Sequence, residues 1–401
     1  MRLAYILLWF PEPSQTFVLN EVNTLVRLGL DVRVYTLFGP RPAGRVAGMG
    51  PAAAPVRHLG TASLGTLLHD LFALRGDGAR TAAFLRQVLI RRWRHPVTAG
   101  EALWAALAGV HLARSFRRDA IHHIHAPWAD GPATAAWVAS RLSGIPFSFS
   151  ARAYDLHPPD GALLEKMAAA AFVRTNTRSN LRYLAHLAPD AASKLVNIYN
   201  GVPLAPRAAP APPPGSPFRL LALGRLVAKK GFPVLLAACR RLAEMKVDFH
   251  LTLAGAGPQR RHLAALVENY RLGDRVTMPG FIPHREVPEL FARTDLLVMP
   301  SVIAPSGDRD GIPNVVLEAL AHELPVVASA VSGLPEVILA GETGWLVPPG
   351  DPEALAAAIM AALQDPAEAR RRARAGRDLV AREFDSAKNY GRLKVWFEHR
   401  G

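Results

Sequence analysis

The order of apolar segments in the first forty residues constrains the fold of this chain most strongly. An apolar run, RLAYILLWF (2–10), leads into TFVLNEVNTLVRLGL (16–30), where apolar side chains recur at helical spacing until Gly29. The next strand is DVRVYTL (31–37). A strand, a helix and a strand in so few residues form a β-α-β unit, which joins parallel strands. The N-terminal run is therefore predicted to be a buried strand and not a signal peptide.

The same order recurs along the rest of the chain. Further strands are predicted at 121–126 and 145–150, and a new series begins at residue 218. Both halves are thus predicted to be doubly wound α/β domains, with ligands beyond the carboxyl ends of the strands, in a cleft between the domains. The new series alternates strands at 218–224, 249–255, 275–280, 295–301 and 325–329 with helices at 232–245, 258–270, 286–293 and from about 313.

A proline-rich segment separates the two halves. APRAAPAPPPGSP (205–217) has six prolines in thirteen residues, which excludes a regular helix or a central strand. A chain of 401 residues also exceeds what one hydrophobic core usually organises. We expect a first domain at 1–203, a semi-rigid linker at 204–217, a second domain at 218–385, and a final helix at 386–401 that packs on the first domain.

Composition and charge narrow the class of protein. Cys239 is the only cysteine, so no disulfide within the chain is expected and a reducing compartment fits. No apolar run reaches the roughly 18 residues that a spanning helix needs. Residues 1–203 hold 22 Lys and Arg against 12 Asp and Glu, so they carry +10 of the net charge of +14. This positive charge could attract nucleic acid, an anionic membrane surface or a phosphorylated substrate. The alternative is that it only reflects a composition rich in arginine.

Two acids flank a predicted helix start in DGIPNVVLE (310–318). Pro313 suits the first helical turn, where free backbone N–H groups bind anions. Asp310 precedes this start and Glu318 lies about one turn inside it. Carboxylates accept strong hydrogen bonds from sugar hydroxyls, so a nucleotide sugar fits the pattern. Compensation of the helix dipole is the alternative explanation for Glu318.

A basic loop follows the first strand of the second domain. GRLVAKKG (224–231) places Arg225 and Lys230 at the carboxyl end of that strand, where two cations could stabilise a departing diphosphate without a metal. An ordinary solvated loop is the alternative.

A glycine turn in LAGAGPQ (253–259) allows close approach of a backbone to a ligand at Gly255 and Gly257. Arg260 takes the third glycine position of the dinucleotide fingerprint, and no GxxxxGK[ST] occurs. Dinucleotide-dependent oxidoreductases and P-loop NTPases are therefore disfavoured.

Together these stretches resemble the retaining glycosyltransferases of family 4, whose fold is called GT-B. The resemblance is carried by GRLVAKKG, DGIPNVVLEALAHELPVVASAVSGLPEVI and GETGWLVPPGDPEAL in the second half, and by FPEPSQTFVLNEV, IHHIHAPWADGPATAAWVASRLSGIPFSFSARAYDLH and NIYNGVP in the first. The first-half stretches look like the branch that builds exopolysaccharides, such as the colanic acid and amylovoran transferases.

The resemblance implies a hexosyl transfer that keeps the anomeric configuration and needs no metal, cofactor or protein nucleophile. The donor is then a UDP-sugar or a GDP-sugar, and the acceptor is a saccharide or a lipid-linked saccharide. The implied location is the cytoplasm, at the inner face of the cytoplasmic membrane, with no nucleic-acid partner.

The resemblance also implies roles for individual residues. Glu318 would hold the ribose hydroxyls, and Asp310 would contact the donor sugar ring. Arg225 and Lys230 would bind the diphosphate and stabilise the leaving group, and His125 would lie near the reaction centre. Further substrate contacts are implied at Ser14, Gln15 and Thr16 for phosphates or acceptor, at Gly255, Gly257, Phe281 and Ile282 for the base, and at Arg152, Gly311, Ile312, Pro313 and Asn314.

Two positions depart from the family pattern. Asp310 is one methylene shorter than the usual Glu, so its contacts with the donor sugar differ. Arg152 stands where many relatives have a histidine, which favours an anionic acceptor. His123 and His125 lie on one side of a strand, but no further ligand cluster accompanies them, so a polar role is preferred to a metal site.

The region 56–118 is predicted to form amphipathic helices. Trp93 and Trp104 lie near Arg-rich helix ends, so these helices either pack on the first domain or dock on anionic lipid. Two alternatives for the whole chain also stay open. One is another GT-B enzyme, an epimerase or a phosphorylase, although no pyridoxal-phosphate lysine motif occurs. The other is a non-catalytic scaffold docked at a membrane.

Overall fold

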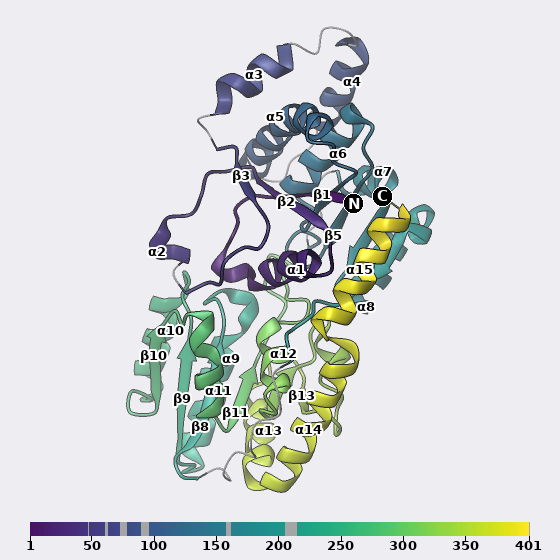
Figure 1. Ribbon diagram of the computed structural model, residues 1–401. Helices are drawn as coiled ribbons and strands as arrows, with labels where there is room; N and C mark the ends of the chain where they lie inside the picture. The colour runs from purple at the N-terminus through teal and green to yellow at the C-terminus, as the bar shows by residue number, and fades with distance from the viewer. Residues whose placement is uncertain are drawn as a thin grey trace. The chain divides into compact units, whose positions relative to one another are not determined.

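The computed structural model describes residues 1–46, 48–60, 63–72, 78–89, 96–157, 162–204 and 215–400. The chain divides into two compact units, one made of Met1–Tyr199 with Ala387–Gly401 and the other of Asn200–Ser386. Each unit is described by itself, with the element labels of Figure 1. Most of the predicted linker, residues 205–214, lies outside the described residues, as do Arg91, Arg92, Trp93 and Arg94.

The first unit is built on a parallel sheet with strand order β3-β2-β1-β4-β5-β6-β7. The chain moves outward from β1 to β3 and then returns to β4 beside β1, so the sheet is doubly wound. The strands are β1 (Arg2–Leu7), β2 (Asp31–Thr36), β3 (Val56–His58), β4 (His123–Ala126), β5 (Phe147–Ala151), β6 (Phe172–Thr175) and β7 (Leu195–Asn197).

Helices cover both faces of this sheet, so the side chains of its central strands are buried on both sides. Along β4, Ile124 and Ala126 belong to an apolar cluster with residues of α5 and α6, whereas the rings of His123 and His125 contact Phe397 of α15 on the other face. The helices of this unit are α1 (Thr16–Arg27), α2 (Ala43–Val46), α3 (Leu64–Phe72), α4 (Gly78–Leu89), α5 (Pro96–Arg118), α6 (Gly131–Ser143), α7 (Leu163–Ala169), α8 (Arg178–Leu187) and α15 (Ser386–Arg400).

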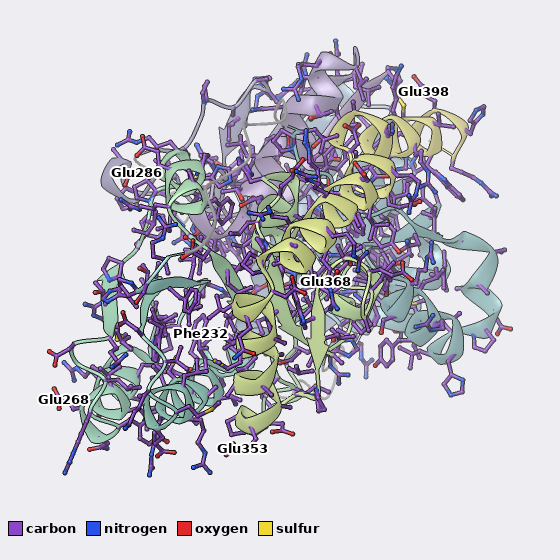
Figure 2. The ribbon with its side chains drawn as sticks, turned by 90° about the horizontal axis from the view of Figure 1, so that it is seen from below. Phe232, Glu268, Glu286, Glu353, Glu368 and Glu398 are labelled. Carbon is purple, nitrogen blue, oxygen red and sulfur yellow. The ribbon has the colours of Figure 1, made fainter. Side chains whose placement is uncertain are left out.

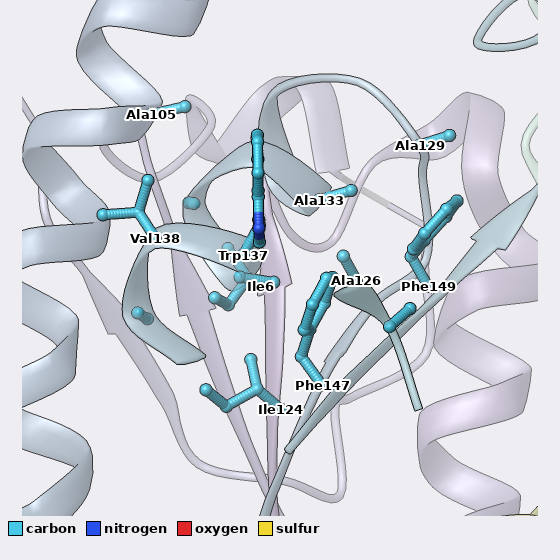
Figure 3. Packing of buried hydrophobic residues seen from close by; sticks show 14 of the residues in the cluster. Ile6, Ala105, Ile124, Ala126, Ala129, Ala133, Trp137, Val138, Phe147 and Phe149 are labelled. Carbon is cyan, nitrogen blue, oxygen red and sulfur yellow. The ribbon is translucent and has the colours of Figure 1, made fainter. Parts of the chain in front are cut away.

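Small side chains let α5 and α6 pack closely. A Cβ atom at Gly109 of α5 would lie 2.7 Å from the carbonyl oxygen of Ala135 in α6. Figure 3 shows Ile6, Ile124 and Phe147 of the sheet facing Trp137 of α6. This packing holds α6 over the strands whose carboxyl ends carry the polar loops of the first unit.

The second unit is built on a parallel sheet with strand order β10-β9-β8-β11-β12-β13. Phe232 at the start of α9 is fully buried, whereas Glu268 and Glu353 point outward, as Figure 2 shows. The strands are β8 (Phe218–Leu223), β9 (Phe249–Ala254), β10 (Val276–Gly280), β11 (Leu296–Met299), β12 (Val326–Ser329) and β13 (Trp345–Val347). The helices are α9 (Phe232–Glu244), α10 (Arg260–Asn269), α11 (Val287–Ala292), α12 (Asn314–Ala321), α13 (Pro352–Gln364) and α14 (Pro366–Glu383).

The prediction of two doubly wound parallel α/β folds is confirmed. One addition concerns the region 56–118, for which the sequence predicts amphipathic helices and no strand. Residues Val56–His58 form the edge strand β3 beside β2. The sequence does not predict this strand, because three residues are too few to show an alternating apolar pattern. Within the described residues, no helix has the length and apolarity needed to cross a bilayer.

Of the two alternatives for Trp104, its contacts support packing on the first unit. The indole Nε1 of Trp104 donates a hydrogen bond to the carbonyl oxygen of Leu37 at 2.8 Å, and its ring stacks on Phe38. Trp104 is therefore a packing residue of the first unit.

Candidate functional site

The second unit brings three polar loops to one edge of its sheet. These loops follow β8, β9 and β11, and the carboxyl ends of parallel strands meet at the same edge. Asp310 lies in the loop that joins β11 to α12. Pro313 is the N-cap residue of α12, with φ −62° and ψ 125°, so the helix begins one residue later than predicted.

Asp310 is surrounded by cations. Its Oδ2 atom lies 2.8 Å from Nζ of Lys230, and its Oδ1 atom lies 3.6 Å from Nζ of Lys229. Ser301 donates a weaker hydrogen bond to the same carboxylate at 3.4 Å. Burial acts to raise the pKa of Asp310, but Lys230, Lys229 and Arg225 together hold that pKa below its usual value. The group is therefore a carboxylate at neutral pH.

Lys229 was missed in the sequence, although it is the more buried of the two lysines. Its Nζ lies 3.0 Å from Oδ1 of Asp308, and its side chain is only 3% exposed. The signal was the adjacent pair Lys229–Lys230 after a strand, but the carboxylates that both lysines contact come from a loop about 80 residues away. Arg225 is exposed on the same loop.

The other acid, Glu318, pairs with a histidine. Its Oε1 atom lies 3.1 Å from Nε2 of His284, in the short loop between β10 and α11. The hydrogen bond that His284 donates to Glu318 raises the pKa of His284 above its usual value. His284 was not singled out in the sequence, because a lone histidine in a loop carries no pattern.

Gly255 and Gly257 act in the packing of one loop against another. Their φ angles are +145° and +159°, and added Cβ atoms would lie 1.8 Å from the carbonyl oxygen of Gly224 and 2.5 Å from that of Leu226. The loop after β9 therefore lies directly on the loop that carries Arg225. This contact explains why glycine is needed, and it supports the basic loop without requiring a ligand.

The remaining predicted contacts of the second unit differ in exposure. Phe281 is 53% exposed and Ile282 is partly exposed, whereas Gly311, Ile312 and Pro313 are buried. The side-chain oxygen of Asn314 lies 3.3 Å from Nδ2 of Asn200. Phe281 thus offers an open aromatic face, and the buried residues shape the loop before α12.

In the first unit, the predicted residues after β1 lie at the start of α1. Ser14 and Gln15 belong to the short helical turn Pro13–Gln15, and Thr16 is the first residue of α1. Ser14 is exposed, and Gln15 accepts a hydrogen bond from Nε1 of Trp128 at 3.2 Å. These side chains lie beside the loop that follows β4.

His125 is buried and does not face solvent. It is 0% exposed, its two ring nitrogens lie 2.8 and 3.2 Å from the hydroxyl oxygens of Ser148 and Ser150, and Phe397 packs on its ring. Burial lowers the pKa of His125 well below its usual value, so the ring is neutral. The contacts that the structure shows for His125 are therefore internal and hold neighbouring strands together, and its place near the reaction centre stays a prediction.

Arg152 is likewise buried and belongs to a charged network. Its Nη2 atom lies 3.0 Å from Oε2 of Glu21 in α1, and Nη1 of Arg174 lies 2.5 Å from the same oxygen. Tyr5 donates a hydrogen bond to the other oxygen of Glu21 at 3.1 Å. Burial acts to raise the pKa of Glu21, but the two arginines lower it from 4.5 to about 2. The structure thus shows Arg152 in an internal ion pair, and its contact with an anionic acceptor stays a prediction.

Asp130 is a polar residue of the first unit that the sequence did not reveal. It follows β4 and precedes α6, and its Oδ1 atom is buried without a hydrogen-bond partner. Burial raises its pKa well above the usual value, and Glu101 and Asp155 add to this effect. A single Asp at a helix start gives no sequence signal of this kind, because the neighbouring acids come from other segments.

Metal coordination requires several ligand side chains at one place. The described residues contain no group of three or more His, Cys, Asp or Glu side chains that could hold an ion. The cations of the second unit are instead lysine and arginine side chains.

Known proteins share both sequence and fold with this chain. Residues 208–379 match the family Glycosyl transferases group 1. WcaL of Salmonella typhimurium, which carries the name of a colanic acid biosynthesis glycosyltransferase, is 42% identical over 146 residues, or 36% of each chain. The amylovoran biosynthesis glycosyltransferase AmsK of Erwinia amylovora is 37% identical over 177 residues, or 44% of each chain. The aligned stretches therefore span less than half the length of these curated relatives.

A solved structure shows the same fold along the whole chain. Alr3699/HepE of Anabaena, solved in complex with UDP, matches with a TM-score of 0.72 over 100% of both chains at 16% identity. The same protein has also been solved with UDP-glucose. Residues 208–379 therefore match a group 1 glycosyltransferase domain, and the two Rossmann-like units share the GT-B fold of the solved structure.

Proposed function

We propose that this chain transfers a hexose from a nucleoside-diphosphate sugar to a saccharide or lipid-linked saccharide acceptor in the synthesis of an exopolysaccharide or cell-envelope glycan. The observation that carries the proposal is the cluster of Arg225, Lys229 and Lys230 around Asp310 at the carboxyl edge of the second sheet. The names of WcaL and AmsK support the polysaccharide context. The complexes of Alr3699/HepE with UDP and UDP-glucose support the class of donor.

The charge balance of this cluster suits a diphosphate. Lys229 and Lys230 are matched by the carboxylates of Asp308 and Asp310. Arg225, which is exposed on the same loop, leaves an excess of one positive charge. The free N–H groups at the start of α12 add partial positive charge beside it. Arg225 and this helix start therefore supply net positive charge, and the ammonium of Lys230, which has three N–H donors, can donate to a phosphate oxygen as well as to Asp310.

Each end of the donor has a partner beside this cluster. Glu318 accepts hydrogen bonds from the ribose hydroxyls, and His284 holds its carboxylate in place. The exposed ring of Phe281 provides a face on which the base stacks. Asp310 accepts hydrogen bonds from the donor sugar.

The transfer keeps the anomeric configuration and needs no metal or cofactor. As the bond between the anomeric carbon and the phosphate oxygen breaks, Lys230 and Arg225 stabilise the negative charge on the departing diphosphate. The acceptor hydroxyl attacks from the same face, and a leaving phosphate oxygen takes its proton. No side chain then has to act as a nucleophile.

We propose that the protein acts at the inner face of a cytoplasmic membrane. A lipid-linked acceptor would lie there, and the +10 balance of residues 1–203 attracts anionic headgroups. This part of the proposal is independent of the chemistry of transfer.

A thermal-shift panel of UDP-sugars and GDP-sugars tests the donor. A ligand that binds only the folded protein raises its melting temperature, so one nucleotide sugar should stabilise it more than the free sugar does. A non-catalytic scaffold without a donor site would respond to none of them. A GT-B epimerase would respond too, but would convert the sugar without transfer to an acceptor.

A further inference from the structure

A hollow lies in the first unit, whereas the cluster of Arg225, Lys229, Lys230 and Asp310 that carries the proposed transfer belongs to the second unit. It has a volume of about 460 Å³ and is formed beside the edge strand β3, its neighbour β2, the helix α3 and the C-terminal half of α5. In Figure 1, β3 lies at the edge of the sheet with α5 alongside it. Small-molecule sites commonly have volumes of about 300–1,000 Å³, so a sugar-sized ligand fits.

The lining of this hollow is basic and rich in hydroxyl groups. Arg57 of β3 and Arg118 of α5 line it together with His58 and His111, and no carboxylate is among the lining residues. Hydroxyl groups and aliphatic side chains complete the wall, from Tyr35, Leu59, Ser63, Thr66, Leu112 and Ser115.

One acid stands behind the two arginines. Oδ2 of Asp119 lies 2.5 Å from Nη1 of Arg57, and Oδ1 lies 3.4 Å from Nε of Arg118. Tyr35 also donates a hydrogen bond to this carboxylate at 3.2 Å. Burial acts to raise the pKa of Asp119, but Arg118 and Arg57 hold it below its usual value, so one negative charge faces two positive charges.

The two guanidinium groups keep donors for a ligand. The side chains of Arg57 and Arg118 are 54% and 72% exposed, whereas that of Asp119 is 10% exposed. Each guanidinium has five N–H donors in a planar fork. The single carboxylate of Asp119 can accept hydrogen bonds from only some of the N–H groups of the two arginines. The carboxylate therefore orients the arginines from behind and leaves a net positive charge at the mouth.

The histidines are fixed by partners outside the hollow. Nδ1 of His111 lies 2.7 Å from Oδ2 of Asp70, which leaves Nε2 near the hydroxyl of Ser115. Nδ1 of His58 lies 2.7 Å from Oγ1 of Thr36. Each ring thus has one nitrogen tied to a neighbouring element, while its other side lines the hollow.

We propose that this hollow binds a small phosphorylated ligand of the size of a hexose phosphate. Two arginines held side by side match the oxygens of a phosphate better than a single surface cation does. The hydroxyl groups of Ser63, Thr66 and Ser115 suit the polar remainder of such a ligand. The phosphate could belong to a free sugar phosphate or to a phospholipid headgroup.

Calorimetric titration with inorganic phosphate and with glucose 6-phosphate tests this site. The variant in which Arg57→Gln and Arg118→Gln are combined should bind both probes at least tenfold more weakly at this site, because each arginine contributes charge-assisted hydrogen bonds. Arg285→Gln is the matched control, since Arg285 is 69% exposed and also pairs with a neighbouring acid. Phosphate binding by the lysines of the second unit should be equal in the wild type, the double variant and the control. The difference in affinity between the double variant and the control therefore reports on the hollow alone.

Two further measurements decide the source of the phosphate and the place of binding. Hydrogen exchange should show protection by glucose 6-phosphate in peptides covering residues 56–66, and this protection should disappear in the double variant. If the ligand is a lipid headgroup, vesicles that contain phosphatidic acid should bind the wild type and should bind the double variant more weakly. If the ligand is a free sugar phosphate, the vesicles should not distinguish the two proteins. The proposal is overturned if the double variant binds both probes as tightly as the Arg285→Gln control, or if residues 56–66 gain no protection. Because exchange elsewhere reports the fold, a misfolded variant is recognised and replaced by the single Arg118→Gln change.

Discussion

At the scale of residues, the two acids around α12 are held by different partners. Asp310 contacts the ammonium groups of Lys229 and Lys230, whereas Glu318 contacts the imidazole of His284. The side chain of Glu318 is 18% exposed and that of Asp310 is 12% exposed, so both still reach solvent. The spacing of the acids was visible in the sequence. Their partners were not, because these come from loops 34 and about 80 residues away.

The exchange Glu318→Ala should weaken nucleotide binding by about 1.5–3 kcal/mol, because the ribose hydroxyls lose a charged acceptor. Isothermal calorimetry with the best nucleotide of the panel measures this loss. Glu286→Ala is the control, since Glu286 lies two residues from His284 and is exposed. Equal affinities in the two folded variants would remove Glu318 from the donor site.

The loss of Glu318 should also change the titration of His284. The pKa of His284 is raised in the folded protein, so the ion pair contributes stability below the ordinary histidine pKa and loses it as the pH rises through the raised value. In NMR titrations, the His284 pKa should therefore fall in Glu318→Ala. An unchanged pKa would show that the pair does not form in solution.

Glu21 connects the residue scale to the stability of the first unit. Glu21→Gln should destabilise this unit by about 3–5 kcal/mol, because the buried Arg152 and Arg174 lose the anion they share. Asp31→Asn is the control, since its surface pair with Arg2 should matter by less than about 1 kcal/mol. Urea unfolding followed by tryptophan fluorescence reports on the first unit, which holds every tryptophan except Trp345.

The same network gives a pH dependence with a defined sign. The pKa of Glu21 is lowered from 4.5 to about 2, so its stabilising effect is complete above pH 4.5 and is lost as the pH falls toward 2. The wild-type unfolding midpoint should therefore fall over this range, and the part due to Glu21 should be missing in Glu21→Gln. Parallel pH profiles for both proteins would contradict the ion-pair assignment.

At the scale of elements, the alternation of strands and helices was predictable, and buried polar contacts were not. Apolar periodicity located β1, α1 and β2, because these elements bury regular faces. The burial of His125 could not be foreseen, since it depends on α15, more than 250 residues further along the chain. The short strand β3 was missed because three residues carry too little pattern.

A substitution of glycine by alanine, which adds one methyl group, tests the contact between the loops after β8 and β9. Gly255→Ala should destabilise the second unit by about 3 kcal/mol or more, because the new Cβ would lie 1.8 Å from the carbonyl oxygen of Gly224 at a φ of +145°. Gly273→Ala is the control, since its Cβ meets nothing within 4 Å. Thermal unfolding compares the two. Equal melting temperatures would mean that the loops do not pack as described.

At the scale of the whole molecule, the uneven charge of the chain makes membrane docking testable. Each Lys or Arg near an anionic surface contributes about 1 kcal/mol, and salt screens the effect. The protein should therefore sediment with anionic vesicles, and less so as salt is added. Changing Arg91, Arg92 and Arg94 to Glu should release it.

A second triple variant controls for net charge. Changing Arg370, Arg374 and Arg382 to Glu alters the charge of the exposed face of α14 by the same amount. This variant should stay bound to anionic vesicles, and both variants should keep donor turnover. Equal release of the two would show that only net charge matters, and equal binding to neutral vesicles would end the docking hypothesis.

The turnover of the donor tests the proposed transfer most directly. The nucleotide sugar with the largest thermal shift is incubated with the protein in EDTA, and proton NMR follows the nucleoside diphosphate and the anomeric configuration of the first sugar product. The proposed mechanism predicts release with retained configuration, at a rate that EDTA does not change. It also predicts a loss of about 10²–10³ in rate for Lys230→Ala, because the leaving diphosphate loses a cation. Lys394→Ala, which removes a surface pair with Glu398, should turn over the donor like the wild type. An inverted product, a loss of activity in EDTA, or a Lys230→Ala variant as fast as the wild type would contradict the mechanism.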